Sequence, residues 1–176
     1  MLGYNPVNVY FISGLYMNSA VTKKIDRIDK NILFELQKNG RLSNIELSKR
    51  VGLSATPCLE RVKRLENDQF IVGYQAILNP RKLDAALLVI VEITLTKTSP
   101  DVFDDFSKAV HGLDVIQECH LVSGNFDFLL KTRVADMTAY RELLGDTLLR
   151  LPAVSESRTY VVMEEVKSSN HLPIKR

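Results

Sequence analysis

The chain has 176 residues, enough for one ordinary domain or two small ones. Hydrophobic residues make up 45% and charged residues 25%, which is typical of a globular protein and excludes disordered and fibrous chains. The net charge of +2 is too small to indicate a nucleic-acid partner, but residues 24–68 hold ten Lys or Arg against seven Asp or Glu. The basic excess is therefore confined to one segment.

Three classes of protein are disfavoured by simple patterns. Cys58 and Cys119 lack C-x-x-C spacing, which indicates a reducing compartment with both as buried thiols. No apolar run approaches the roughly 18 residues that a membrane-spanning helix needs. The N-terminal stretch has no basic region and no clean apolar core, so it is a poor signal peptide. We predict that residues 1–22 are an unstructured or upstream extension, with Met17 as a second start; the alternative is a short extra strand.

The first predicted helix follows this extension. Its apolar residues recur at helical spacing from Ile25 to Leu36, and Asp26 and Asp29 lie in its first turns, where acidic side chains favour the positive helix end. Asn39-Gly40 ends the helix. This helix should form the third side of a small core with the two helices that come next.

Residues 43–65 read as two short helices joined by a turn. Ser43 and Glu46 have the S-x-x-E spacing of a capping box, and Gly52 ends the first helix where a left-handed backbone is needed. Ser54 is the predicted N-cap of the second helix, and Pro57 falls in its first turn.

The second helix is predicted to be amphipathic. Leu59, Val62 and Leu65 should pack, while Arg61 and Arg64 should face outward as cations. A basic second helix after a tight turn suits a DNA major groove; the alternative is a helical hairpin with solvated charges. The residues expected to contact DNA are Asn44, Lys49, Arg50, Ser54, Thr56, Pro57, Glu60, Arg61, Lys63 and Arg64.

Aromatic and β-branched residues over 70–80 predict a strand, either a wing or a linking strand, ended by Asn79-Pro80. We place a domain boundary near Leu83. Residues 23–83 would form a three-helix, winged helix-turn-helix domain, and residues 84–176 a ligand-sensing and oligomerisation domain.

The second domain alternates strands and helices. We predict strands at 87–96, 115–123, 126–134 and about 157–167, with Gly124-Asn125 as a two-residue hairpin turn. Ser99-Pro100 and Asp136 should open two helices, the second of which Pro152 stops. The order is that of a ferredoxin-like βαββαβ fold, so the protein is α+β.

Such a fold leaves one sheet face bare. Leu88 and Ile90 on the first strand, and Tyr160 and Val162 on the last, predict that this face is apolar. Because a bare apolar face is a liability in a monomer, we predict a homodimer packed sheet against sheet.

The sequence resembles the Lrp/AsnC family, and within it the branch of global regulators, over residues 25–175. The resemblance rests on KIDRIDKNIL, NIELSKRVGLSATPCLERVKRLE and IQECHLVSGNFDFLLKTRV, followed by LLRLP and TYVVMEEVK. It implies an N-terminal DNA-binding domain, a C-terminal amino-acid-sensing domain and homodimers that assemble further, often to octamers.

The resemblance also implies an effector site at the hairpin after the second sensing strand, at a contact between dimers. Glycine would let main-chain groups approach a carboxylate, and Asp127 could pair with an ammonium group. Alternatively, Gly124 serves only the turn, Asp127 caps the hairpin, and the apolar residues are core or interface. The expected site residues are Leu121, Ser123, Gly124, Asn125, Phe126, Asp127, Met137, Tyr160, Val161 and Val162. The expected effector, by resemblance, is leucine or another apolar amino acid.

We therefore expect a cytoplasmic, nucleoid-associated transcriptional regulator, activator or repressor, that binds double-stranded DNA and controls amino-acid metabolism genes. No metal or other cofactor and no membrane partner are expected. One alternative is a DNA-wrapping protein without an effector. A second, an enzyme of the siroheme decarboxylase type, is disfavoured because Cys119 and His120 must point to opposite strand faces and no catalytic motif occurs.

Overall fold

The computed structural model describes residues 24–175 and divides them into two compact units. The first unit combines residues 24–76 with residues 169–175, and the second is Ile77–Ser168. The division falls before the predicted boundary at Leu83, and the last residues belong with the first unit. The extension predicted for residues 1–22 lies outside the described residues.

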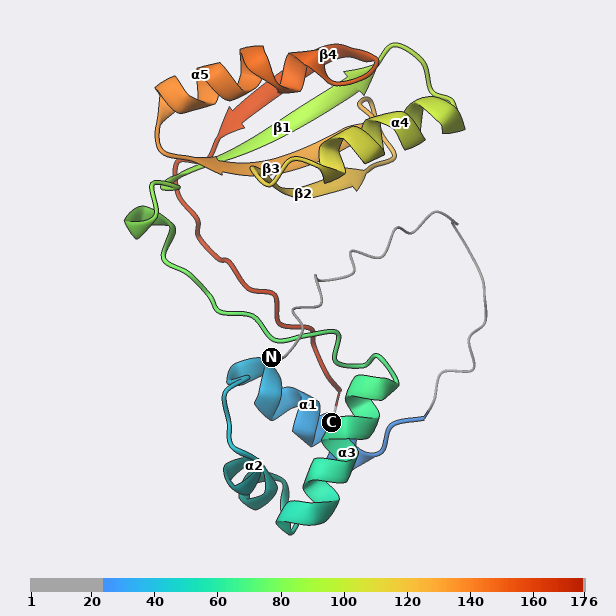
Figure 1. The fold of residues 1–176 in the computed structure, drawn as a ribbon, viewed down its shortest axis with the longest axis vertical. Helices are drawn as coiled ribbons and strands as arrows, with labels where there is room; N and C mark the ends of the chain where they lie inside the picture. The colour runs from blue at the N-terminus through green and yellow to red at the C-terminus, as the bar shows by residue number, and fades with distance from the viewer. Residues whose placement is uncertain (1–23, 176) are drawn as a thin grey trace, which may run out of the picture. The chain divides into compact units, whose positions relative to one another are not determined.

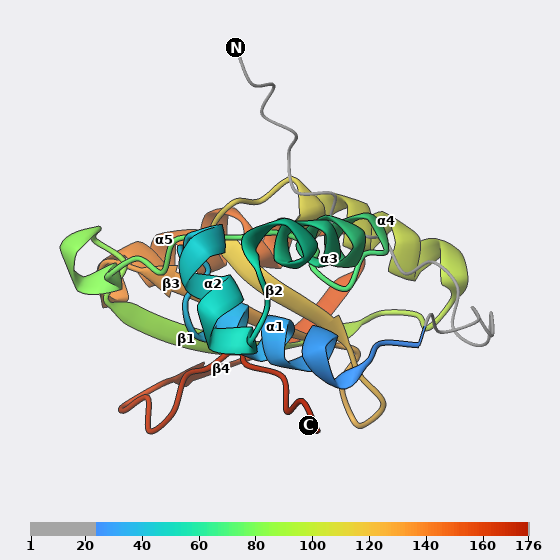
Figure 2. The same cartoon turned by 90° about the horizontal axis from the view of Figure 1, so that it is seen from below.

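The first unit is built from three helices, α1 (Arg27–Lys38), α2 (Asn44–Val51) and α3 (Ala55–Asn67). Figures 1 and 2 show α2 and α3 joined by a short turn, with α1 beside them. Their apolar stripes meet in a core of Ile32, Leu47, Val51, Cys58 and Leu65. The three-helix prediction is therefore confirmed.

Helix α3 contributes Cys58 to the core, and not the expected Leu59. Cys58 is fully buried, whereas the side chain of Leu59 is 41% exposed. The prediction that Leu59 packs is wrong, because at about 100° per residue these neighbours point in different directions and the core of α1 and α2 lies on the side of Cys58. The expectation of a buried Cys58 is confirmed.

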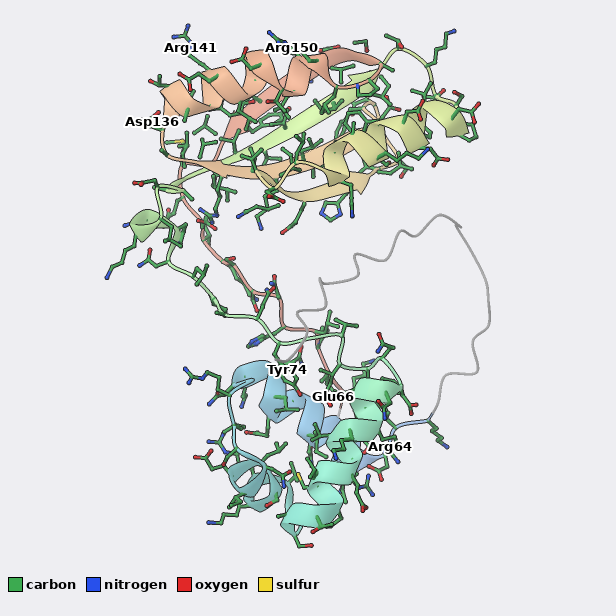
Figure 3. The ribbon with its side chains drawn as sticks, viewed as in Figure 1. Arg64, Glu66, Tyr74, Asp136, Arg141 and Arg150 are labelled. Atoms are coloured by element: carbon green, nitrogen blue, oxygen red, sulfur yellow. The ribbon has the colours of Figure 1, made fainter. Side chains whose placement is uncertain are left out.

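The strand predicted over residues 70–80 is absent from the described part of the chain. These residues run without regular structure to a short turn at Pro80–Lys82. Tyr74 is part of the first unit, and its hydroxyl donates to Glu66 Oε1 of α3 at 3.0 Å (Figure 3). Burial first, and then this hydrogen bond, raise the pKa of Tyr74 to about 12. Propensity favours a strand here, but a strand also needs a neighbour to pair with.

The second unit is a four-stranded antiparallel sheet in the order β2-β3-β1-β4, with β1 (Leu87–Leu95), β2 (Ile116–Leu121), β3 (Phe128–Val134) and β4 (Val154–Val161). Helices α4 (Pro100–His111) and α5 (Met137–Asp146) lie on the same face (Figure 1). Phe106 of α4 and Leu130 of β3 are fully buried in the core between these layers. The ferredoxin-like order is the predicted one.

Three boundaries in this unit differ from the predictions. The connection between β2 and β3 spans residues 122–127 rather than two residues. Helix α5 ends at Asp146, before a short turn at Leu148–Arg150, and so does not run on to Pro152. Strand β4 begins and ends earlier than predicted because it pairs with β1, so that Val154 lies opposite Leu95 at the end of β1 and Val161 lies opposite Val89 near its start.

The sheet face away from the helices is only partly apolar. Ile90 lies opposite both Tyr160 and Lys131, and Glu92 lies opposite both Arg158 and Leu129. Charged residues therefore alternate with apolar ones across this face, and the prediction of an apolar face is wrong in that respect. The sequence pattern hid this because β1 itself carries a single charge, and the others come from its partner strands.

Candidate DNA-binding and effector sites

The helix-turn-helix begins with a complete capping box. Ser43 Oγ accepts from the backbone N–H of Glu46 at 3.2 Å, and Glu46 Oε2 accepts from the Ser43 N–H at 3.0 Å. The bonds from the Ser43 hydroxyl and backbone lower the pKa of Glu46. Gly52 closes the helix at φ 73° and ψ 37°, as predicted for a left-handed C-cap. These local bonds determine where α2 begins and ends.

Helix α3 presents one exposed stripe. Thr56, Leu59, Glu60 and Lys63 recur at helical spacing and are all exposed. We call these four residues the exposed stripe of α3. A threonine, a leucine, a carboxylate and an ammonium group match the chemistry of base edges and phosphates in a major groove. Leu59 was missed by the sequence prediction, because a leucine at helical spacing reads first as core.

Arg61 and Arg64 do not lie on this stripe. Arg61 Nη1 donates to Asp26 Oδ2 at 2.7 Å and to Asp29 Oδ1 at 2.8 Å, and Arg64 Nη2 donates to Asp29 Oδ2 at 2.6 Å. The hydrogen bonds to Asp26 and Asp29 raise the pKa of Arg61. Arg64 is exposed, as predicted, whereas Arg61 is half-buried, and α1 brings two carboxylates to both, which the sequence did not predict. They also line an open groove with Pro57 and Glu60.

Three other predicted DNA-contacting residues lie on or before α2. Asn44 Nδ2 donates to the backbone oxygen of Ala55 at 2.7 Å and so ties the start of α2 to α3, while its Oδ1 is buried without a hydrogen-bond partner in the described structure. Arg50 Nη1 donates to Glu35 Oε2 at 3.0 Å. Lys49 is exposed. Of these three, Asn44 and Arg50 are held by the hydrogen bonds given above, and Lys49 is not.

Ser54 is the N-cap of α3 by position, but its side chain makes no capping hydrogen bond. Its hydroxyl is exposed at the start of the helix. Pro57 is half-buried in the first turn, where its missing N–H leaves no intrahelical bond unmade. Ser54 can therefore donate to a phosphate, whereas Pro57 serves the helix start.

The predicted effector turn is anchored to β1. Asp127 donates its N–H to the Ile93 oxygen at 2.9 Å, and its Oδ2 accepts from the Leu95 N–H at 2.7 Å. The backbone oxygen of Asp127 also accepts from the Val122 N–H at 2.9 Å, which closes the loop. The pairing of Val122 with Asp127 leaves residues 123–126 as the loop, and the bonds to β1 hold Asp127, so the predicted two-residue turn is wrong.

Gly124 lies at the exposed tip of this loop with Ser123 and Asn125, whereas Phe126 is half-buried. The φ of Gly124 is not in the left-handed region, and a Cβ added to it would meet no atom within 4 Å. The turn itself therefore does not require glycine in this conformation.

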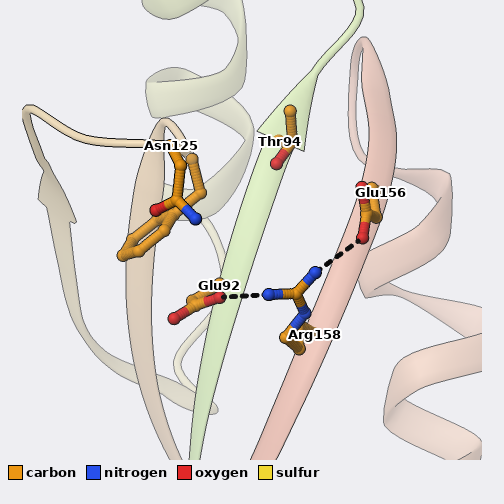
Figure 4. A pocket seen from close by; sticks show the side chains of 6 residues that line it. Glu92, Thr94, Asn125, Glu156 and Arg158 are labelled. Atoms are coloured by element: carbon orange, nitrogen blue, oxygen red, sulfur yellow. Dashed lines mark hydrogen bonds and ion pairs between the residues drawn. The ribbon is translucent and has the colours of Figure 1, made fainter.

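A small pocket opens beside the loop (Figure 4). Asn125 and Phe126 line it together with Glu92 and Thr94 of β1 and Glu156 and Arg158 of β4. The Arg158 guanidinium lies 3.9 Å from Glu92 Oε2 and 3.3 Å from Glu156 Oε1. The cavity volume is about 30 Å³, which is room for water and not for an amino acid. Sequence reasoning missed these charged residues, although Glu92 is the lone charge in an apolar strand.

The predicted effector residues do not all lie close together in one copy of the chain. Leu121 directly precedes the loop, but Met137 follows the far end of β3, and Val161 pairs with Val89 near the start of β1. Tyr160 and Val162 flank Val161. The length of β3, about 20 Å at 3.3 Å per residue, separates Met137 from the loop, whereas Tyr160 pairs with Ile90 in the middle of β1. One copy of the chain therefore does not bring Met137 to the loop.

Cys119 and His120 do not form a reactive pair. Cys119 packs toward the helices, and burial raises its pKa to about 11, whereas His120 is exposed beside Glu118 at 3.2 Å. The two neighbours point to opposite faces, as predicted. Within residues 24–175 no group of three or more His, Cys, Asp or Glu side chains could hold a metal ion. None of the helices in this range has the length and apolar character needed to cross a membrane.

Comparison with known proteins gives the family. Residues 25–72 match a winged helix-turn-helix DNA-binding model, and residues 88–172 match the Lrp/AsnC ligand binding domain. The leucine-responsive regulatory proteins of Klebsiella pneumoniae and Escherichia coli K12 are each 71% identical over 153 residues, which cover 87% of this chain and 93% of theirs.

Solved structures share the fold. A transcriptional regulator from Neisseria meningitidis in complex with L-Met is 35% identical with a TM-score of 0.81, and covers 85% of this chain and 97% of its own. An AsnC family regulator from Agrobacterium tumefaciens is 32% identical with a TM-score of 0.80, over 85% of this chain and 97% of its own. Together with the two matched domain models, these likenesses show that the chain belongs to the Lrp/AsnC family of DNA-binding transcriptional regulators.

Proposed function

We propose that this regulator binds specific DNA sequences as a homo-oligomer and responds to an apolar amino acid, leucine or methionine. The observation that carries the DNA-binding part is the capped α2–Gly52–α3 motif with its exposed stripe. Thr56, Leu59, Glu60 and Lys63 would meet base edges, and Ser54, Lys49 and Arg50 would meet phosphates. The likenesses to leucine-responsive regulatory proteins and to a regulator solved with L-Met support the choice of effector.

We propose that the effector binds at residues 123–127 and that a second copy of the chain completes the site. The pocket beside the loop is too small for leucine, Met137 lies beyond the far end of β3, and Val161 and Val162 lie toward that end of the sheet. An arrangement in which two dimers meet would bring both groups together, and a further assembly such as an octamer follows from repeating it. Effector binding would then shift the assembly only by its differential affinity for the two states.

The regulator would act in the cytoplasm, on genes of amino-acid metabolism, as activator or repressor without catalysing a reaction. A DNA-wrapping role alone would make the protein indifferent to amino acids. We therefore choose a test that follows assembly and DNA binding together.

The test is analytical ultracentrifugation with an amino-acid panel, run in parallel with DNA binding. Leucine or methionine should change both the mass and the DNA affinity, while glycine and D-leucine should change neither. Tight, salt-dependent DNA binding with no response to any amino acid would contradict the sensing role and favour a wrapping protein. No DNA binding at any salt concentration would contradict the DNA-binding role.

A further inference from the structure

Asp29 is a carboxylate in an unusual place. It lies in the first turn of α1, yet only 1% of it is exposed. A buried charge is stable only if it is paired and hydrogen-bonded. Its partners therefore decide how α1 packs.

The partners of Asp29 come from α1 itself and from α3. Its Oδ1 accepts from Arg61 Nη1 at 2.8 Å, and its Oδ2 accepts from Arg64 Nη2 at 2.6 Å and from the Asp26 N–H at 3.0 Å. Asp26 Oδ2 also accepts from Arg61 Nη1, at 2.7 Å. We call Asp26, Asp29, Arg61 and Arg64 the ionic cluster; Figure 3 labels Arg64 on α3.

The cluster holds two carboxylates and two guanidinium groups, so its charges cancel. Removing either arginine to reach DNA would leave the buried Asp29 charge with one partner fewer, which is unfavourable in a medium that solvates charge poorly. Arg61 and Arg64 therefore each have one guanidinium nitrogen held by the protein, which disfavours a role for them in reading bases.

The cluster acts with the buried Cys58 and Leu65 to hold the rotation of α3 about its own axis. At 100° per residue, Arg61 lies roughly 100° from Glu60, and Arg64 lies roughly 40° from it, at the edge of the exposed stripe. When the arginines face Asp29, the stripe of Thr56, Leu59, Glu60 and Lys63 must face outward. An α3 released from Asp29 could turn, and the bases would then meet different side chains.

We propose that Asp29 is a positioning residue for DNA recognition, which holds Arg61 and Arg64 so that the exposed stripe of α3 reads the bases. The proposal rests on the DNA-binding function proposed above. It assigns recognition to apolar and acidic contacts: Leu59 and Thr56 suit a thymine methyl group, and Glu60 can accept from cytosine N4.

The test uses the full chain and two duplexes. The first is a short duplex enriched from a random-sequence pool by the wild-type protein, and the second is its scrambled version. Asp29→Asn should weaken binding to the enriched duplex about tenfold or more, the loss typical of a misplaced base contact. Binding to the scrambled duplex should stay the same or strengthen, because the released arginines can reach phosphates. The matched control is Asp105→Asn, which removes an exposed carboxylate of α4 paired with Lys108.

Arg64→Gln provides a second route if Asp29→Asn does not fold. Arg64 is half exposed, so this variant is expected to fold. It should also weaken binding to the enriched duplex, but the salt dependence of binding should keep its slope, because Arg64 is paired with Asp29 and not with a phosphate. A loss of purely structural origin would weaken both duplexes equally.

Besides equal weakening of both duplexes, two results would overturn the proposal. One is wild-type affinity for the enriched duplex in Asp29→Asn. The other is a salt slope lowered by about one in Arg64→Gln, which would mean that this arginine contacts a phosphate. A wild-type chain that enriches no sequence from the pool would overturn the sequence-specific function as well, and so is distinguishable from failure of the positioning role alone.

Discussion

Asp127 combines a structural contact with a predicted effector contact. Its Oδ2 accepts from the Leu95 N–H at 2.7 Å, and Leu95 is 5% exposed. The bond anchors residues 122–127 to β1 and is one reason why the loop differs from a tight hairpin. The two roles can be separated, because the structural bond needs only an oxygen acceptor and ammonium pairing needs a negative charge.

Asp127→Ala and Asp127→Asn should therefore behave differently. The alanine variant leaves the buried Leu95 N–H without its acceptor and should lose about 1–3 kcal/mol of unfolding free energy. The asparagine variant keeps an oxygen acceptor and should stay near wild-type stability while losing the effector response. Urea denaturation and the ultracentrifugation panel measure the two effects. An asparagine variant that still responds fully to leucine would contradict a charge-based role in effector binding.

Asp26 makes the stability of the first unit sensitive to acid. The bond from the Asp29 N–H and then the bond from Arg61 lower the pKa of Asp26 below its ordinary value of 3.8. Since the folded state holds this proton less tightly, the stabilisation is present above pH 3.8 and is lost as the pH falls through the folded-state pKa.

Asp26→Asn should be less stable than wild type near neutral pH, and the difference should shrink as the pH falls below 3.8. Thermal denaturation followed by circular dichroism at several pH values measures this. Asp104→Asn, an exposed carboxylate of α4, is the control and should track the wild type. A constant difference between Asp26→Asn and wild type at all pH values would show that ionisation is not the cause.

Helices α2 and α3 start with the same residue type but with different chemistry. Ser43 makes the reciprocal bonds of a capping box, whereas Ser54 makes no side-chain capping bond. The sequence predicted both serines to be N-caps, because each precedes an apolar helical pattern. Only Ser43 has a Glu three residues on, and that spacing is what made its bonds predictable.

Ser43→Ala should cost about 1 kcal/mol of unfolding free energy, and Ser54→Ala markedly less. The two variants are matched, since each removes one exposed hydroxyl at a helix start. Urea denaturation of the full chain checks the difference. Equal losses would contradict the assignment of the cap to Ser43 alone.

Among the elements, those with local signals were predictable. The caps, Gly52 and the apolar periodicity of α1 lie within a few residues of each other, so the helices were foreseen. The strand predicted over residues 70–80 was not found, because strand formation depends on a neighbour that the local sequence does not specify. The end of β4 at Val161 likewise depends on its pairing with Val89 of β1, close to where β1 begins.

The assembly of the protein can be tested at the sheet face away from the helices. Ile90 alternates with the buried Val89 and Val91 on β1, so it lies on that face beside Glu92. If two copies pack through this face, Ile90→Asp should bury an unpaired charge in the interface and shift the protein toward monomer.

Sedimentation velocity at several concentrations measures that shift. Val166→Asp is a matched control, because Val166 is 88% exposed outside the strands and should leave the mass unchanged. An Ile90→Asp variant that keeps the wild-type mass would contradict dimerisation through this face. Loss of helical circular dichroism in Ile90→Asp would instead indicate unfolding. In that case the milder change Ile90→Thr would be measured in its place.

The helix-turn-helix and the βαββαβ order could be derived from the sequence, because capping, periodicity and strand–helix alternation act between residues close in the chain. The pairing of Arg61 and Arg64 could not, since their carboxylate partners lie 32 to 35 residues away on another helix. The same holds for Leu59 and for the charged residues beside Asn125, whose surroundings come from distant segments. Tertiary packing thus decided which side chains of α3 are paired and which remain exposed, because it assigns partners that local sequence cannot specify.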